Sequence, residues 1–493
     1  MKHILSAILY SAIALLCVCS CGSSGDDDPI VSPNTLKESL VLRSASVADG
    51  AVVKAGELST ITLSYNEKVQ VSPEARITLN GTPCQAATSR ETMLKIDVAL
   101  PALEAGQHYT LSIPSGSILG VVDPLTTAPA FTLTFTTQEA PQPAVFDDLS
   151  NPNATAEARN VYDFLKSIYG QKQLSGVQSS MSNTNDFVDN VYNALGKHPA
   201  LAGYDFLFLP FSPTPPGWSW VQNYGDISAA QEQWQHNGLV SYMWHWNVPN
   251  SEADFNNCVD HDATDNMGFY ISGDGATSFD IREALKEGTW QHRCIMRDIE
   301  EVAGYLGQLQ EAGIPVIFRP LHEAAGNYTK YNPQGGAWFW WGRYGAEPCK
   351  QLYRLLHDQF TRVYGLNNLI WVWTIDVVDG MEEQARDWYP GHDVVDIVGV
   401  DVYTDQVKAP LTHQYETLVA TVDGRKMTTL SECGNIPDPE VQHQSALNWL
   451  WFMVWPSDAN GITGAYTANT TDYWRQVTTS SCVLNREDMP SLK

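Results

Sequence analysis

The sequence has few positive charges for its length. Its 493 residues include 29 Lys and Arg against 56 Asp and Glu, which gives a formal net charge of -27. A surface this acidic repels nucleic acid and anionic membrane, so we expect neither as a ligand. A neutral polymer meets no such repulsion, and the 16 Trp and 21 Tyr residues supply flat rings that can stack on sugars.

The chain also lacks the short motifs of several enzyme classes. It contains no Gly-x-Ser-x-Gly elbow and no Gly-rich phosphate loop. His322-Glu323 begins like a zinc-protease helix, but Gly326 stands where the second histidine is required. No EF-hand-type loop occurs. We therefore expect no metal and no other cofactor, with a calcium site in so acidic a chain left open.

Cysteines in metal-ligand or redox spacing are absent as well. Three of the nine cysteines lie in the first 21 residues, and the other six are scattered without a Cys-x-x-Cys pair. They are Cys84, Cys258, Cys294, Cys349, Cys433 and Cys482. The sequence assigns no disulfide among them.

The N-terminal apolar run, Ile4–Val18, is too short for a comfortable transmembrane helix. The residues that follow, Val18-Cys19-Ser20-Cys21-Gly22, resemble a bacterial lipobox with Cys21 as the lipidated residue. We therefore predict a lipoprotein signal peptide over residues 1–20 and an outer-membrane lipoprotein exposed at the cell surface. A plain secreted signal peptide is the alternative.

An all-β segment is predicted after a linker at residues 21–39. Residues 40–137 contain alternating runs such as Thr60–Tyr65 and Phe131–Phe135, separated by turn signals such as Asn80-Gly81. This pattern predicts a small β-sandwich, and the segment resembles bacterial Ig-like modules. We expect it to be a spacer, with glycan binding as the alternative.

Residues 138–150 read as a second linker, and the pattern then changes to helices alternating with apolar runs through residues 151–493. Eight runs can be counted: Leu174–Gln178, Leu201–Leu207, Leu239–Trp246, Pro315–Glu323, Leu369–Ile375, Ile397–Tyr403, Met427–Glu432 and Trp451–Trp455. Helical stretches between them include Ala156–Ile168, Ile295–Ala312 and Pro348–Val363. This alternation predicts an α/β fold, a (β/α)8 TIM barrel with long loops. A doubly wound open sheet is the rival, but the Gly-rich turn typical of it is missing.

Polar and aromatic residues occupy the ends of these runs, where a barrel carries its catalytic groups. Two ends carry a glutamate, Glu323 on the fourth run and Glu432 on the seventh. Glycoside hydrolysis needs two carboxyl groups across one bond, one protonated and one ionised. We therefore predict that Glu323 and Glu432 are catalytic. The alternative for either is a salt bridge at the barrel mouth.

Five motifs carry a more specific resemblance. Their residues, in chain order, are Met243–Pro249, Arg319–Glu323, Trp338–Gly342, Gly399–Tyr403 and Leu430–Gly434. Together they resemble glycoside hydrolase family 26, which consists mainly of endo-β-1,4-mannanases, with some β-1,3-xylanases and mixed-linkage glucanases. The resemblance spans about residues 160–455.

The resemblance implies roles for these residues. Glu323 would be the general acid/base and Glu432 the nucleophile of a retaining mechanism. His322 would lie near the 2-hydroxyl of the attacked sugar, and Tyr403 would orient the nucleophile. The remaining implied site residues line the cleft (His245, Trp246, Trp338 and Trp455) or support it (Asp205 and Asp401).

One segment departs from the family pattern, because Ala324–Ala337 separates the His-Glu pair from the aromatic run. It could form a loop at the leaving-group side or a surface excursion. The expected function is that of a monomeric retaining endo-β-1,4-mannanase acting on β-mannan, galactomannan or glucomannan. A β-1,3-xylanase, a mixed-linkage β-glucanase and a non-catalytic glycan-binding lipoprotein are the alternatives.

Overall fold

A computed structural model of the chain describes residues 39–54, 56, 58–89, 92–138, 146–179, 183–207, 209, 223–259, 266–273, 275–326, 337–376, 382–455 and 467–493. The predicted signal peptide, Cys21 and most of the segment between Ala324 and Ala337 lie outside these residues. The chain divides into two compact units, Met1–Gln142 and Pro143–Lys493. No helix in the described part of the chain is both long and apolar enough to span a bilayer.

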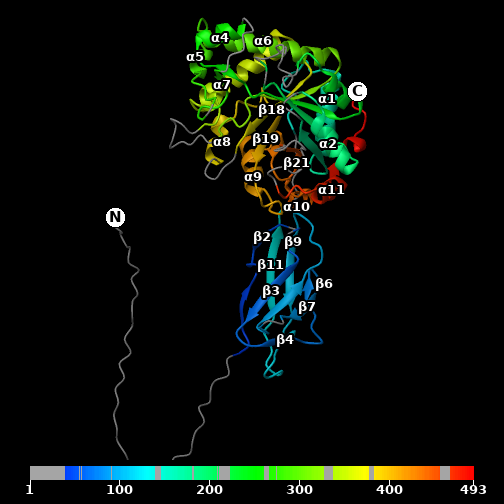
Figure 1. Ribbon diagram of the computed structural model, residues 1–493. Coiled ribbons are helices and arrows are strands. Elements are labelled where there is room, and N and C mark those ends of the chain that lie inside the picture. Colours follow the sequence, from blue (N-terminus) through cyan, green and yellow to red (C-terminus); the bar gives the residue numbers. More distant parts are fainter. Residues whose placement is uncertain are drawn as a thin grey trace, which may run out of the picture. The chain divides into compact units, whose positions relative to one another are not determined.

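The N-terminal unit is a small all-β domain (Figure 1). One sheet has the strand order β1-β3-β8-β7, another has the order β2-β11-β9-β5-β6, and β10 pairs with β4. Alternation along β3 buries Ile61, Leu63 and Tyr65, as a sheet with one face toward a core requires. The strands are β1 (Leu42–Ala45), β2 (Ala51–Val53), β3 (Thr60–Tyr65), β4 (Val69–Val71), β5 (Thr78–Leu79), β6 (Thr82–Pro83), β7 (Gln85–Thr88), β8 (Lys95–Ala99), β9 (His108–Ile113), β10 (Ile118–Gly120) and β11 (Phe131–Thr137).

The C-terminal unit is a closed barrel of eight parallel strands. The strands are β12 (Gln173–Gln178), β13 (Leu201–Asp205), β14 (Leu239–Met243), β17 (Val316–Arg319), β18 (Leu369–Ile375), β19 (Ile397–Val402), β20 (Met427–Cys433) and β21 (Trp449–Val454). The barrel closes because β12 pairs with β13 on one side and β21 on the other. An open doubly wound sheet is thereby excluded. A short strand, β22 (Val483–Leu484), extends the pairing beside β12.

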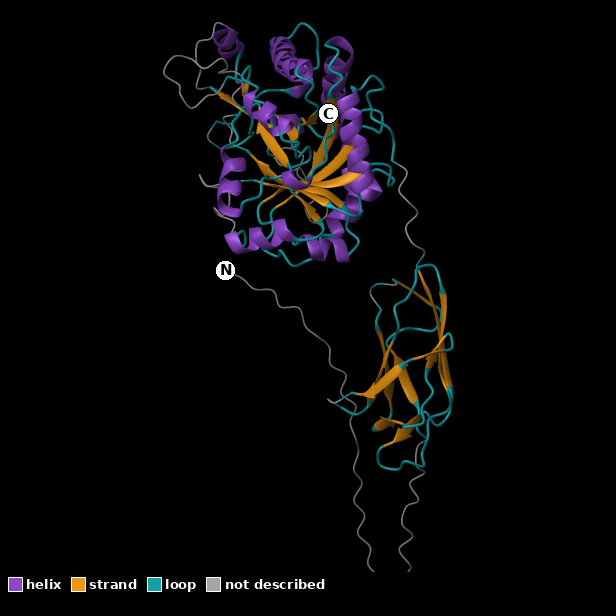
Figure 2. Cartoon of the chain, turned by 90° about the vertical axis from the view of Figure 1, so that its right-hand side faces the viewer, coloured by secondary structure: helices purple, strands orange, loops and turns teal. Residues whose placement is uncertain are grey.

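Helices surround this barrel, as the view in Figure 2 shows. They are α1 (Ala156–Ile168), α2 (Asp186–Leu195), α3 (Ser228–Gln235), α4 (Glu252–Val259), α5 (Ile281–Ala284), α6 (Trp290–Glu311), α7 (Ala346–Asp358), α8 (Glu382–Trp388), α9 (Thr412–Thr421), α10 (Pro439–Gln444) and α11 (Thr471–Thr479). The long connection between β14 and β17 also contains a two-stranded ribbon, β15 (Val248–Pro249) and β16 (Met267–Gly268).

Local sequence explains why these elements form. All residues of β18 and β20 are buried, which is why barrel strands read as continuous apolar runs rather than alternating ones. Helix α1 begins after Thr155, whose side chain accepts a hydrogen bond from the Ala158 N–H and so satisfies one free donor of the first turn.

The predicted barrel is confirmed, and its fourth strand differs in one respect that concerns function. The apolar run was expected to continue as a strand to Glu323, but β17 ends at Arg319. Pro320 cannot donate a ladder hydrogen bond, and Leu321 and Glu323 both have positive φ, 51° and 48°. Glu323 therefore lies on a turn beyond the strand.

Candidate active site at the C-terminal mouth of the barrel

Four acidic side chains meet at the C-terminal ends of adjacent barrel strands. Glu323 follows β17, Asp376 follows β18, Asp401 lies on β19 and Glu432 lies on β20. Each of the four residues is at most 8% exposed. Parallel strands bring their carboxyl ends to one rim, so residues more than 100 positions apart in sequence become neighbours.

Arg319 supplies the positive charge within this group. Its Nη1 lies 3.1 Å from Asp401 Oδ2, and its Nη2 donates to Glu432 Oε1. Burial lowers the pKa of Arg319, but the charges of Glu432 and Asp401 outweigh burial and hold that pKa above its ordinary value. The guanidinium therefore stays charged and holds two of the carboxylates in place.

Glu432 is held from both of its oxygens. Arg319 donates to Oε1, and the Tyr403 hydroxyl donates to Oε2 at 2.7 Å. The pairing of β19 with β20 shifts register between Val400 and Asp401, so Asp401 lies opposite Glu432. Two donors on one carboxylate fix its orientation, as a nucleophile requires.

Glu323 has the opposite environment. Burial raises the pKa of Glu323 well above its usual range, and the nearby Asp401, Glu432 and Asp376 charges raise it further. A carboxyl group in this environment stays protonated at neutral pH and can act as a general acid. Its left-handed backbone conformation is costly for a residue with a side chain, and such strain is common at active sites.

The carboxyl groups are close enough to act on one bond. One oxygen from each of Glu323, Asp401 and Glu432 lies within 4.8 Å of the others. Three such groups could in principle hold a cation, but the Arg319 guanidinium already bonds to two of them. The arrangement therefore has a built-in positive charge and does not require a metal to balance it.

A second polar chain runs beside the carboxyl groups. Asp205 Oδ2 accepts from His245 Nδ1 at 2.5 Å, and His245 Nε2 lies 3.1 Å from His322 Nε2. Of the two facing Nε2 atoms, one must donate to the other. Burial and the neighbouring His245 and Arg319 lower the pKa of His322 well below its ordinary value, so this ring is neutral. Its Nδ1 is buried, and the described residues give it no partner.

Two of the expected aromatic residues border the site. Trp338 is 37% exposed and lines the same hollow as Glu323. Gly326 makes room for the Trp338 ring, since a Cβ there would lie 2.7 Å from its Cε3. Trp455 follows β21, and its ring centroid lies 5.7 Å from that of His245. The expectation that Trp338 and Trp455 touch sugar stays a prediction.

Trp246 has a different place from the one expected for it. We predicted that it lines the cleft, but its side chain is fully buried and its Nε1 donates to Asp298 at 2.8 Å. Its ring stacks on Trp244 with centroids 3.9 Å apart. A ring without exposed surface cannot stack on a sugar, so Trp246 supports the loop that carries His245.

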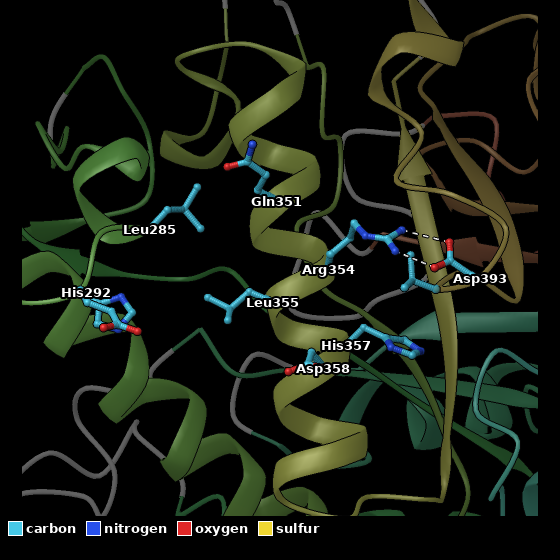
Figure 3. Close-up of a pocket in the computed structure, with 10 residues that line it drawn as sticks. Leu285, His292, Gln351, Arg354, Leu355, His357, Asp358 and Asp393 are labelled. Atoms are coloured by element: carbon cyan, nitrogen blue, oxygen red, sulfur yellow. Dashed lines mark hydrogen bonds and ion pairs between the residues drawn. The ribbon is translucent and has the colours of Figure 1, made fainter.

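A hollow of about 410 Å³ opens beside Glu323. Trp338, Asp376, Asp401 and Tyr403 also line it, together with residues of the connection between β19 and α9. Figure 3 shows a larger hollow, of about 620 Å³, along α7, where Arg354 pairs with Asp393. Neither catalytic candidate lines that second hollow, so its size does not mark the site.

Arg319 and Asp376 are site residues for which no role was predicted from the sequence. Arg319 was noted only as part of a motif, although a charged residue at the end of a buried strand is a signal in itself. Asp376 directly follows the apolar run Leu369–Ile375, for whose end no candidate was predicted. Its position one residue beyond a buried strand is the signal in the sequence that marks it.

A closed barrel with paired carboxyl groups at its mouth is the arrangement of the (β/α)8 glycoside hydrolases. Within that class, residues 150–488 match the family model described as glycosyl hydrolase family 26, and the chain belongs to this family. The five motifs therefore identified the family correctly.

Proteins similar to this chain include curated enzymes. A mannan endo-1,4-β-mannosidase of Thermothelomyces thermophilus is 38% identical over 325 residues, covering 65% of this chain and 59% of that protein. Mannan endo-1,4-β-mannosidase B of Piromyces sp. is 32% identical over 350 residues, covering 70% and 54%. The chain thus spans little more than half the length of these curated relatives.

Solved structures agree with the fold. A β-mannanase from a symbiotic protist of the termite Reticulitermes speratus, in complex with a gluco-manno-oligosaccharide, is 31% identical with a TM-score of 0.59. The match covers 71% of this chain and 100% of that one. The family 26 domain of an endo-β-mannanase/endo-β-glucanase from Prevotella bryantii is 32% identical with a TM-score of 0.57, covering 69% and 98%.

Proposed function

We propose that this protein is a retaining endo-β-1,4-mannanase that hydrolyses β-mannan, galactomannan or glucomannan. The observation that carries this proposal is the pair of close carboxyl groups in opposite environments. Glu432 accepts hydrogen bonds from Arg319 and Tyr403, while burial among like charges raises the pKa of Glu323 and keeps it protonated. The names of the relatives support mannan as the substrate.

In the first step, a Glu432 oxygen attacks the anomeric carbon of the bound sugar. Glu323 gives its proton to the glycosidic oxygen, so the leaving sugar departs as a neutral alcohol. A covalent glycosyl ester forms on Glu432. The hydrogen bonds from Arg319 and Tyr403 aim the nucleophile before the reaction, so little reorganisation is needed.

In the second step, Glu323 is ionised and acts as a base. It takes a proton from a water molecule, the water oxygen attacks the anomeric carbon, and the ester bond to Glu432 breaks. Two displacements at one carbon restore the β-configuration. The carboxyl oxygens within 4.8 Å fit the separation of about 5–5.5 Å of retaining enzymes better than the roughly 6.5–9.5 Å of inverting ones.

We further propose that the Asp205–His245–His322 chain contributes to sugar binding. His322 Nδ1 is buried and has no partner among the described residues, so this atom can form a hydrogen bond with a sugar hydroxyl. Asp205 contacts one ring nitrogen of His245, and the other ring nitrogen of His245 contacts His322, so this chain positions the His322 ring.

A panel of polysaccharides tests the proposal. We expect new reducing ends from β-mannan, galactomannan and glucomannan, and mixtures of oligosaccharides rather than one small product. Proton NMR at early time should show the β-anomer first. An α-anomer appearing first would exclude the retaining mechanism, and binding without cleavage would favour a non-catalytic glycan-binding protein.

A mixed-linkage β-glucan belongs in the same panel. The similar Prevotella bryantii protein is named for both mannanase and glucanase activity, which is why this alternative is kept. Turnover of β-glucan at a higher kcat/KM than mannan would replace the proposed substrate and leave the proposed mechanism intact.

A further inference from the structure

Asp376 is a buried carboxyl group that the catalytic steps above do not use. It is 8% exposed and lines the hollow of about 410 Å³ beside Glu323. Its Oδ2 is buried and has no hydrogen-bond partner among the described residues. A buried carboxylate oxygen without a donor is costly, so a donor from a ligand would recover free energy there.

The residues that line the hollow indicate on which side of the cleaved glycosidic bond it lies. Glu323 lines it and Glu432 does not. The acid must reach the glycosidic oxygen, which leaves with the departing sugar, whereas the nucleophile contacts the sugar that stays behind. A hollow that exposes the acid but not the nucleophile therefore lies on the leaving-group side.

The rest of the lining suits a sugar ring. Trp338 offers a partly exposed indole, which can stack on the apolar face of a sugar. Gln406 and Gln414 offer amide groups from the connection after β19 and from α9. Asp376 adds a negative charge, and charged acceptors form stronger hydrogen bonds to hydroxyl groups than neutral ones do.

We infer that Asp376 is a specificity-determining residue that holds the first sugar on the leaving-group side by accepting hydrogen bonds from its hydroxyls. This inference rests on the proposed function, because it assumes the roles of Glu323 and Glu432. It predicts that Asp376 matters for substrates that place a sugar in this hollow and not for those that do not.

The kinetic experiment compares two substrates in the full-length chain at about pH 7. A manno-oligosaccharide places a sugar in the hollow, whereas an aryl β-manno-oligosaccharide places only an aryl group there. We expect Asp376→Ala to lower kcat/KM by about 10–100-fold on the oligosaccharide, and by no more than about threefold on the aryl substrate. Asp376→Asn keeps one acceptor oxygen, so its kcat/KM on the oligosaccharide should lie between those of the wild type and Asp376→Ala. Equal loss on both substrates, or no loss, would overturn the inference.

Asp393→Asn is the matched control. It removes a carboxylate from the hollow in Figure 3, where Asp393 pairs with Arg354, and should leave both substrates unaffected. A wild-type protein that cleaves another β-glycan and no mannan would overturn the proposed substrate. The same comparison, with oligosaccharides and aryl glycosides of that glycan, would still test Asp376.

A binding experiment separates a contact to sugar from an effect through Glu323. Calorimetry of mannohexaose with the Glu432→Gln variant involves no proton transfer to substrate. Adding Asp376→Ala to that variant should weaken binding about tenfold or more. Unchanged affinity, or no binding in the Glu432→Gln variant, would overturn the inference.

Discussion

At the scale of single residues, the site consists of two carboxyl groups of the same kind in different surroundings. Glu432 receives hydrogen bonds from a guanidinium and a phenol, and Glu323 is buried among like charges. Placing titratable groups in unlike environments is how one protein provides an acid and a nucleophile at the same pH.

Replacing either glutamate should abolish most turnover without unfolding the chain. We expect Glu323→Ala and Glu432→Ala each to lower kcat on mannan by about 10²–10⁴-fold or more. Azide should restore activity on an aryl β-mannoside in both variants, giving the β-azide with Glu323→Ala and the α-azide with Glu432→Ala. Glu347→Ala, on the exposed start of α7, is the control. An α-azide from Glu323→Ala and a β-azide from Glu432→Ala would show that Glu323 is the nucleophile and Glu432 the acid/base.

Asp376 should cost the protein stability at neutral pH. Burial raises the pKa of Asp376 to about 6, above the value of about 3.9 in an unfolded chain. An acid with a raised folded pKa is most stabilising when protonated, and that stability is lost as pH rises from about 4 to 6. At pH 8, Asp376→Asn should therefore raise the free energy of unfolding by about 1–3 kcal/mol.

The measurement is denaturant unfolding of both proteins at pH 4 and pH 8, with the gain expected only at pH 8. Asp393→Asn should lower the free energy of unfolding at pH 8, because the Arg354 hydrogen bond lowers the pKa of Asp393 and so stabilises its ionised form in the folded protein. Equal gains at both pH values would show that the charge of Asp376 is not the cause.

At the scale of elements, the turn after β17 sets the direction of Glu323. Leu321 and Glu323 have positive φ, and the Trp341 indole donates to the His322 carbonyl at 3.1 Å. The aromatic run after Ala337 thus contributes in two ways, since Trp338 borders the hollow while Trp341 braces the turn.

Gly326 connects these two parts of the site. An added Cβ would lie 2.7 Å from Trp338 Cε3 and 3.0 Å from the Glu323 carbonyl oxygen. Gly326→Ala should therefore displace the Trp338 ring and the Glu323 backbone. We expect kcat/KM to fall by about 10–100-fold, because a misplacement of about 1 Å can lower a rate by that much. The assay is hydrolysis of manno-oligosaccharide.

Gly304→Ala is a control of the same chemistry, on helix α6, where a Cβ would meet nothing within 4 Å. It should keep full activity and stabilise the protein by about 0.5–1 kcal/mol. Wild-type activity in Gly326→Ala would show that the turn tolerates the displacement.

At the scale of the whole molecule, the chain combines an all-β unit with a family 26 barrel. We propose that the all-β unit is a spacer between a lipid anchor at Cys21 and the barrel. An enzyme held outside the cell suits a polymer too long to enter it. The Ig-like assignment and the lipidation stay predictions.

The anchor is tested by Cys21→Ala. We expect the wild-type protein to be found in the outer-membrane fraction and to be sensitive to protease on intact cells. The variant should be lost from the membrane, because it lacks the cysteine that would carry the acyl chains needed for stable attachment. Wild-type protein that is soluble in the medium would refute the lipoprotein prediction. Membrane-bound protein resistant to protease would keep the lipid and place the barrel on the periplasmic side.

The sequence by itself determined the barrel and the family, and it predicted that two glutamates meet at the barrel mouth. Buried parallel strands leave continuous apolar runs, and the C-terminal ends of such runs meet at one rim, so Glu323 and Glu432 could be paired from spacing and motifs alone. Asp205, His245 and His322 could be expected near that rim for the same reason.

Only the tertiary structure decided what each of these side chains contacts. Trp246 and Trp338 both lie in aromatic motifs, yet one is buried against Asp298 and the other is exposed beside Glu323. The roles of Arg319 and Asp376 depend on neighbours far away in sequence, since charge pairing and desolvation act through space. The sequence pattern can show that Arg319 and Asp376 lie at strand ends, but not which groups they meet, which is why their roles could not be predicted.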